Sequence, residues 1–325
     1  MEHTLTTSEI NIGVIGLGLM GSSIVAALLV AGHPVKAIAP LPIDMELAPQ
    51  RIADQLNQCE KAHLLIRSPA DYLTQLTISA DYDQLHDCRL VLECVIENLD
   101  IKKSVYQKIE AVVSPDAIVA SNTSAIPISI LQTYFSRPER FLGIHWAEPA
   151  YMTRFMEITC GEKTASAYAD WAYHLAHQWQ KEPTLLRKDI RGFVTNRLMY
   201  AIYREALHLI DTNETTMEDI DKAFRYDMGS WVTLMGPFRR LDYQGLQDLP
   251  EIFKNILPKL SNNDQVSPLM QHMIDLRVRG TQSVQGLYNY TPEEARQWNE
   301  AFAIFNQDIY QLAAQYPAAQ SNETP

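Results

Sequence analysis

The chain of 325 residues is predicted to adopt an α/β fold, in which a mostly parallel sheet domain is followed by an all-helical C-terminal domain. Short apolar runs alternate with longer amphipathic stretches over the first half, as in a parallel sheet covered by helices. A glycine-rich loop follows the first of these runs, and beyond Pro183 the apolar residues recur at helical spacing. At about 150 residues per domain the length suggests two domains. We place them at residues 1–187 and 188–325.

The individual elements follow from local patterns. Six apolar runs predict strands: Ile12–Ile15, Val35–Ala39, Arg89–Val95, Ala117–Ala120, Phe141–Ile144 and Met156–Thr159. Five amphipathic stretches predict helices: Ser22–Ala31, Asp100–Val113, Ser166–Trp179, Asn196–Ile210 and Glu293–Ala314. Gly32 ends the first helix, and Thr216 is placed to cap a further one. Thr184–Leu186 is the last segment with strand character.

Composition excludes several classes of protein. Lys and Arg total 27 against 39 Asp and Glu, and the net charge of −12 argues against binding to a phosphate backbone. No apolar run reaches the length of a membrane span, and the polar segment Met1–Glu9 lacks the apolar core of a signal peptide. The 4 cysteines form no CxxC pair and are typical of buried thiols in a reducing compartment. We therefore expect a cytoplasmic enzyme with neither a nucleic-acid nor a membrane partner.

The glycine-rich loop fits the GxGxxG pattern with Gly16, Leu17, Gly18, Leu19, Met20 and Gly21. The first glycine permits a tight turn, the second admits a pyrophosphate and the third lets the helix pack closely on the strand. The flanking strand and helix favour a Rossmann-like dinucleotide site over a turn that binds nothing. The acidic residue usual after the second strand is replaced by Ala39 and Pro40, with Asp44 a few residues on. The choice between NAD and NADP therefore stays open.

Six ordered segments resemble motifs of the L-3-hydroxyacyl-CoA dehydrogenase family, including its carnitine, gulonate and lambda-crystallin branch. They cover roughly residues 10 to 290 and are Glu93–Lys102, Ala120–Ser124, Gly143–Ile158, Gly192–Leu198, Met235–Leu246 and Gly286–Tyr290. The resemblance implies a homodimeric enzyme of fatty acid metabolism that uses NAD, with NADP not excluded. Its active site would lie between the two domains, and the helical domain would serve substrate binding and dimerisation.

The chemistry of such an enzyme needs a base that takes the hydroxyl proton of a secondary alcohol while hydride leaves. His145 follows a strand at its carboxyl end, and imidazole titrates near neutral pH. The resemblance gives Glu157 the task of orienting this imidazole, and gives Ser124 and Asn196 that of polarising the substrate oxygen.

The resemblance also assigns cofactor contacts and leaves structural alternatives beside them. Glu97 and Lys102 would hold the nicotinamide half, together with Asn122 and Ser124. Glu157 could instead be a solvent-facing strand residue, Ser124 a turn residue, Asn196 a helix cap and Lys102 a helix-surface lysine.

A metal site is not expected. Asp170, His174 and His177 lie at i, i+4 and i+7 of a predicted helix, which is a spacing that can bind a metal. The same helix carries alanines, a leucine and a tryptophan. That pattern favours a solvated face beside a core face.

Two departures from the family pattern concern the substrate. Trp146, Ala147 and Glu148 replace the Phe-Phe-Asn that usually follows the histidine. The stretch that usually meets the CoA phosphates with lysines carries only Arg51, Lys61 and Arg67. An L-3-hydroxyacyl-CoA dehydrogenase therefore stands beside a dehydrogenase of a small, CoA-free 3-hydroxy acid. A dinucleotide-binding structural or sensor protein without turnover is the third hypothesis.

Overall fold

A computed structural model describes residues 6–315, and for residues 299–314 it describes only some of the side chains. The segment Met1–Leu5, part of the polar N-terminus discussed above, lies outside the described residues. The chain divides into two compact units, Met1–Phe193 and Val194–Pro325. None of the described helices is both long and apolar enough to span a bilayer.

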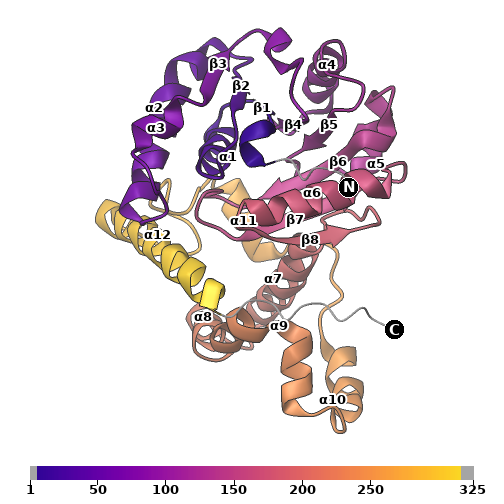
Figure 1. Cartoon of the computed structure of the whole chain (residues 1–325). Helices are drawn as coiled ribbons and strands as arrows, with labels where there is room; N and C mark the ends of the chain where they lie inside the picture. Colours follow the sequence, from indigo (N-terminus) through magenta and orange to yellow (C-terminus); the bar gives the residue numbers. More distant parts are fainter. Residues whose placement is uncertain (1–5, 316–325) are drawn as a thin grey trace. The chain divides into compact units, whose positions relative to one another are not determined.

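The first unit contains an eight-stranded sheet with the order β3-β2-β1-β4-β5-β6-β7-β8 (Figure 1). Its strands are β1 (Ile12–Ile15), β2 (Val35–Ile38), β3 (Leu76–Ser79), β4 (Leu90–Glu93), β5 (Ile118–Ser121), β6 (Phe141–Trp146), β7 (Phe155–Cys160) and β8 (Glu182–Leu186). The strands from β3 to β6 pair in parallel, β7 runs antiparallel to β6, and β8 is parallel to β7. The mostly parallel sheet predicted from the sequence is confirmed.

Six helices accompany the sheet in the first unit. They are α1 (Leu19–Val30), α2 (Pro42–Lys61), α3 (Pro69–Leu73), α4 (Leu99–Glu110), α5 (Ile128–Leu131) and α6 (Ser166–Gln178). Short 3-10 helices lie at Thr7–Glu9, Tyr82–Leu85, Gln132–Tyr134 and Pro138–Arg140. Strands β1, β4 and β5 are buried along their whole length, and α1 is buried at nine successive positions from Gly21 to Leu29. Such continuous burial explains why these segments are mostly apolar.

The parallel strands end at one edge of the sheet, where ligands bind in open α/β folds. The chain leaves β1 at Ile15, β4 at Glu93, β5 at Ser121 and β6 at Trp146. The glycine-rich loop and most of the expected site residues of the first unit therefore start from neighbouring strands.

Several boundaries differ from the sequence-based expectation. Helix α1 begins at Leu19, three residues before the predicted start, because Gly18 is its N-cap residue. Strand β6 continues two residues past Ile144 and so contains His145. Strand β3 and helix α2 were not among the predicted elements: β3 is only half-buried, and α2 has Pro49 in its interior.

The second unit consists of helices with turns between them. They are α7 (Thr195–Asp211), α8 (Met217–Ala223), α9 (Gly229–Gln244), α10 (Leu249–Ile256), α11 (Pro268–Asp275) and α12 (Pro292–Gln315), with a π-helix at Phe224–Met228 and a 3-10 helix at Leu257–Lys259. Thr216 caps α8 as expected, by accepting from the amide of Asp219. Helix α9 is kinked where Gly236 has φ +70° and Pro237 follows.

Candidate active site

The glycine-rich loop joins β1 to α1, and its three glycines meet different surroundings. Gly16 has φ +88°, and a Cβ there would lie 2.9 Å from the carbonyl oxygen of Cys94. A Cβ on Gly21 would lie 1.8 Å from the carbonyl oxygen of Gly16. A Cβ on Gly18 would have nothing within 4 Å. Gly16 and Gly21 are thus required by the fold itself, whereas Gly18 leaves open space of the kind that a pyrophosphate needs.

The other loop residues divide between the core and the surface. Leu17 is fully buried, Leu19 is exposed and Met20 is half-buried. The carbonyl oxygen of Leu17 accepts hydrogen bonds from Ser22 and from the guanidinium of Arg51 on α2. The buried side chain of Leu17 thus anchors the loop in the core, and its carbonyl anchors the loop to α1 and α2.

Antiparallel pairing places His145 on β6 directly opposite Glu157 on β7. The imidazole Nδ1 lies 3.1 Å from Glu157 Oε2, with 16% of the histidine side chain exposed and none of the glutamate. Because a carboxylate only accepts, Nδ1 is the donor in this contact. Glu157 is not the solvent-facing strand residue considered above.

Two phenylalanines bound the imidazole. The ring of Phe155 stands edge-on to that of His145 at a centroid distance of 5.6 Å, and the ring of Phe193 lies at 5.8 Å. Phe193 is 1% exposed and has φ +50° directly after Gly192. The Gly-Phe pair of the sequence motif therefore forms an apolar wall beside the histidine.

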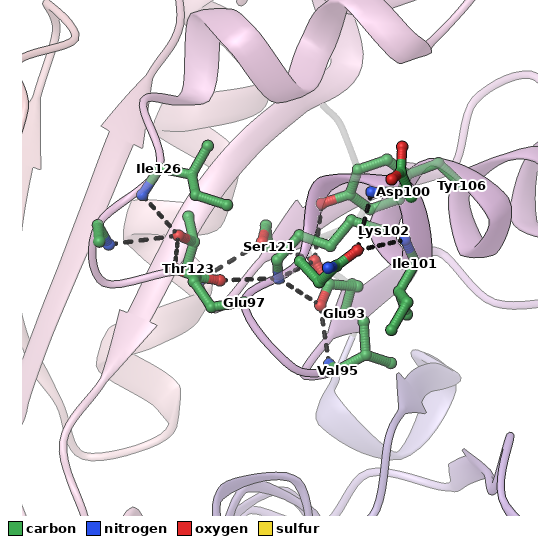
Figure 2. Close-up of polar contacts among 12 residues, drawn as sticks. Glu93, Val95, Glu97, Asp100, Ile101, Lys102, Tyr106, Ser121, Thr123 and Ile126 are labelled. Atoms are coloured by element: carbon green, nitrogen blue, oxygen red, sulfur yellow. Dashed lines mark hydrogen bonds and ion pairs between the residues drawn. The ribbon is translucent and has the colours of Figure 1, made fainter.

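Glu97 and Lys102 belong to a network at the ends of β4 and β5, shown in Figure 2. The ammonium of Lys102 lies 2.7 Å from Glu93 Oε1 and 3.2 Å from Glu97 Oε2, and its side chain is only 1% exposed. Lys102 is thus neither a surface lysine nor open to a ligand. Burial alone would raise the pKa of Glu97, but hydrogen bonds from Thr123 and Lys102 hold it below its usual value. Glu97 remains 37% exposed as an ionised acceptor.

The turn after β5 carries the two other expected cofactor contacts. Asn122 Oδ1 accepts a hydrogen bond of 2.9 Å from the backbone amide of Trp146, which ties the turn to the end of β6. Ser124 follows on the same turn and is exposed. Asn196 lies in the second unit, in the first turn of α7, whose N-cap residue is Val194. It is therefore not the cap of this helix.

The network contains residues that sequence reasoning missed, namely Glu93, Tyr106, Ser121 and Thr123. Glu93 ends an otherwise apolar strand and is fully buried. A carboxylate at the end of a buried strand was a signal available in the sequence. Its partners on α4 and β5 could be identified only from the fold.

The loop between β6 and β7 contains Glu148, the acidic residue that departs from the family pattern. Its Oε2 atom is buried without a hydrogen-bond partner among the described residues. Burial raises the pKa of this carboxyl to about 7, against a hydrogen bond from Ser23 that acts to lower it. The loop is held by Ser23, which accepts from the amide of Ala150, and by Lys181, which donates to the carbonyls of Ala150 and Thr153.

Glu148 is expected to make the stability of the protein depend on pH. Its pKa rises from 4.5 in the unfolded chain to about 7 in the fold, so between these values the folded state binds more protons. This carboxyl by itself should therefore make stability fall as the pH rises from about 5 to 7, whereas burial lowers the pKa of His33 and gives a contribution of the opposite sign. Since the side chain is partly exposed, we expect a loss of only about 1 kcal/mol, or roughly 2–4 °C in Tm. Glu148→Gln should remove this component from thermal melts.

The exposed Glu162 supplies the matched control for this series. Glu162→Gln should melt as wild type does at each pH. Lys181, whose pKa burial lowers to about 7, opposes this trend near pH 7, and its contribution cancels in the difference between wild type and Glu148→Gln. Parallel Tm curves for wild type and Glu148→Gln from pH 5 to 7 would contradict the assignment.

Comparison with known proteins identifies the family. Residues 11–190 match the model of the 3-hydroxyacyl-CoA dehydrogenase NAD binding domain, and residues 192–290 match that of the C-terminal domain. The chain belongs to the 3-hydroxyacyl-CoA dehydrogenase family. It is accordingly an NAD-dependent oxidoreductase that acts on a CH–OH group of a small molecule, and the expectations of family, enzyme class and NAD as cofactor are confirmed.

Individual members of the 3-hydroxyacyl-CoA dehydrogenase family differ in substrate. The chain is 34% identical to a 5-formyl-3-hydroxy-2-methylpyridine 4-carboxylate 5-dehydrogenase of Mesorhizobium japonicum, over 88% of the chain and 92% of the relative. It is 32% identical to an L-carnitine dehydrogenase of Oceanobacillus iheyensis, over 72% and 76% respectively.

Solved structures of the family also differ in the substrates for which the enzymes are named. A 5-formyl-3-hydroxy-2-methylpyridine 4-carboxylic acid 5-dehydrogenase, described as an NAD+-dependent dismutase, has a TM-score of 0.87 at 30% identity, covering 94% of this chain and 99% of that one. The (S)-3-hydroxybutyryl-CoA dehydrogenase of Ralstonia eutropha has a TM-score of 0.73 at 26% identity, with 86% and 99% covered.

Proposed function

We propose that this family member is a dehydrogenase of a small, CoA-free hydroxy carboxylate. The observation that carries the proposal is the scarcity of cations on α2, in the stretch where the family resemblance places the CoA phosphate contacts. Arg51 and Lys61 are the basic residues of α2, and the guanidinium of Arg51 donates to the carbonyl of Leu17. Three phosphates need a richer cationic surface than this. The similarity to a dehydrogenase of a pyridine carboxylate supports a substrate that has a carboxylate and no CoA, although the group at position 5 of that compound is a formyl group and not a hydroxyl.

The His145–Glu157 pair is proposed to move the substrate proton. Nδ1–H is held by the buried carboxylate of Glu157, so Nε2 can accept the proton of the substrate hydroxyl. The charge of Glu157 then stabilises the imidazolium that forms. NAD supplies the hydride acceptor when it is bound. In the reverse direction the imidazolium protonates the oxygen of the reduced ketone.

The remaining site residues are proposed to bind and orient the dinucleotide and the substrate. The space at Gly18 and the ionised Glu97 fit a dinucleotide, with the pyrophosphate against residues 16–21 and the ribose hydroxyls of the nicotinamide half donating to Glu97. Asn122 and Ser124 would contact the same half, and Ser124 and Asn196 would polarise the substrate oxygen. Since its ammonium is enclosed by Glu93 and Glu97, Lys102 would act on the cofactor only through Glu97.

A substrate panel followed at 340 nm tests this proposal. NADH is offered with acetoacetyl-CoA or free acetoacetate, and NAD with L-carnitine or 5-formyl-3-hydroxy-2-methylpyridine 4-carboxylate. Turnover with a CoA-free compound is expected. Rapid turnover with acetoacetyl-CoA alone would reject the proposal in favour of a hydroxyacyl-CoA dehydrogenase. NADPH in place of NADH tests whether Ala39, where an acidic residue is usual, relaxes the choice of cofactor.

We also propose that the second unit forms a homodimer. Among the described residues of this unit, only Ser261, Ser267 and Ala295 are buried. Helices α7, α9 and α10 have no buried residue and expose large apolar side chains instead, among them Leu198, Tyr200, Tyr203, Leu234, Phe238, Ile252 and Phe253. Apolar surfaces of this extent mark protein interfaces, and a second copy of the chain is the partner that the family resemblance implies.

Phe238→Asp is expected to weaken the dimer, because Phe238 is 81% exposed and a buried charge at an apolar interface is costly. Sedimentation equilibrium should give about twice 36.9 kDa for wild type and a value shifted toward 36.9 kDa for the variant. Ile66→Asp, which changes a residue of the first unit that is 92% exposed, is the matched control and should remain dimeric. A monomeric wild type would overturn the proposal.

The proposed compartment is the cytoplasm. Cys59, Cys88, Cys94 and Cys160 are free thiols in the structure, and three of them are buried. Such thiols suit a reducing compartment.

A further inference from the structure

A closed ring of polar contacts joins the ends of β4 and β5 to the start of α4 (Figure 2). Ser121 Oγ donates to Glu93 Oε2 at 2.7 Å and accepts from the amide of Thr123. The hydroxyl of Thr123 donates to Glu97 Oε1. The ammonium of Lys102 closes the ring between Glu97 Oε2 and Glu93 Oε1. Five residues, on β4, β5, α4 and the segments that follow the two strands, are thereby fixed relative to one another.

Glu93 is the member of this ring whose burial costs the most free energy. It is fully buried, and a buried carboxylate is tolerated only when it is paired and hydrogen-bonded. Its two oxygens accept from Lys102, Ser121, Tyr106 and the amide of Val95. An apolar side chain of similar volume would fill such a site at lower cost. The presence of a carboxylate at this buried position therefore points to a role other than packing.

The ring fixes the orientation of the Glu97 carboxylate and determines which part of it faces solvent. One oxygen of Glu97 is held by Thr123 and the other by Lys102, while the side chain stays 37% exposed. Thr123 also accepts from the amides of Ala125 and Ile126, so the turn that carries Asn122 and Ser124 is fixed together with it. Two carboxylates around one ammonium leave a net negative charge. The exposed edge of Glu97 therefore suits hydroxyl donors such as ribose and disfavours a phosphate.

We propose that Glu93 is a positioning residue for dinucleotide binding, which acts through Ser121, Thr123 and Lys102 to hold the carboxylate of Glu97 in place for the ribose. This inference rests on the proposed contact between Glu97 and the cofactor. Neither Glu93 nor Ser121 touches the dinucleotide in this scheme. Their loss should therefore affect affinity for NAD and leave the chemical step at saturating cofactor nearly unchanged.

Two substitutions separate this role from a purely structural one. Ser121→Ala and Tyr106→Phe each remove one 2.7 Å hydrogen bond to the same oxygen, Glu93 Oε2. Ser121 belongs to the ring that contains Glu97. Tyr106 donates to Glu93 but is not a member of that ring. Ser121→Ala should raise the Kd for NADH, measured by fluorescence, about tenfold, as for the loss of a charge-assisted hydrogen bond. It should raise KM for NAD similarly, with kcat changed less than about twofold. Tyr106→Phe should lower the Tm by a similar amount and leave the Kd unchanged.

Glu97→Gln distinguishes the failure of this inference from that of the proposed cofactor contact. If Glu97→Gln weakens NADH binding while Ser121→Ala does not, the ring has no positioning role. Equal weakening by Ser121→Ala and Tyr106→Phe would overturn the route through Ser121 and Thr123, since Glu93 would then act on Glu97 through Lys102 alone. An unchanged Kd in Glu97→Gln would reject the cofactor contact, and the positioning role with it.

Discussion

Replacement of His145 by glutamine is expected to lower kcat at least about a hundredfold, the usual scale for removal of a general base. Glutamine fills a similar volume and can still hydrogen-bond Glu157, so the β6–β7 pair should persist. It cannot accept a proton near neutral pH, and the substrate hydroxyl would lose its base. Because His145 is not part of the glycine-rich loop or of the Glu97 network, NADH affinity should stay within about twofold of wild type.

The measurement is steady-state turnover at 340 nm together with NADH fluorescence titration. His86→Gln is the matched control, because His86 is exposed in the first unit and its Nδ1 bonds to the carbonyl of Asp83. Glu157→Gln should lie between wild type and His145→Gln, since a neutral amide can orient the ring but stabilises imidazolium poorly. Near-normal turnover of His145→Gln would remove the general base from the mechanism. Tight NADH binding without turnover in wild type would favour the sensor hypothesis.

The strands and helices nearest the site were predictable because their patterns are local. The glycine-rich loop sits between a buried strand and a buried helix, as its spacing indicates. The pairing of His145 with Glu157 was different. Twelve residues separate the two, and only the antiparallel register of β6 and β7 makes them direct neighbours. The family resemblance pointed to the two residues, and the structure shows that their side chains are in contact.

The contacts around Glu93 could not be predicted from local pattern. Ser121 lies 28 residues from Glu93 and Tyr106 lies 13 away, on a neighbouring strand and on α4. Lys102 reads in sequence as one of several lysines on a helix, yet it is the one whose helical position faces the buried carboxylate. Such pairings depend on strand order and on the helix packed against it. These are properties of the assembled sheet, which explains why the sequence did not predict the residues that support Glu97.

Substitution of Gly18 by valine is expected to abolish dinucleotide binding and leave the fold intact. Gly18 is the N-cap residue of α1 with φ −62° and ψ −164°, an extended conformation that any residue can adopt. A Cβ there meets no atom within 4 Å, so the protein leaves room next to the backbone at this position. We expect the pyrophosphate to approach the loop backbone and the first turn of α1 through this room. The NADH fluorescence change should be lost while the Tm stays within about 2 °C of wild type.

Gly21→Ala is the informative counterpart, because a single methyl group there would lie 1.8 Å from the carbonyl oxygen of Gly16. That variant should unfold at lower temperature whether or not NADH is present, since α1 can no longer pack against the loop. Loss of binding in Gly18→Val at normal Tm therefore separates recognition of the cofactor from stability of the loop. Normal NADH titration of Gly18→Val would mean that the pyrophosphate does not approach the second glycine, and the cofactor would have to bind elsewhere along this edge of the sheet.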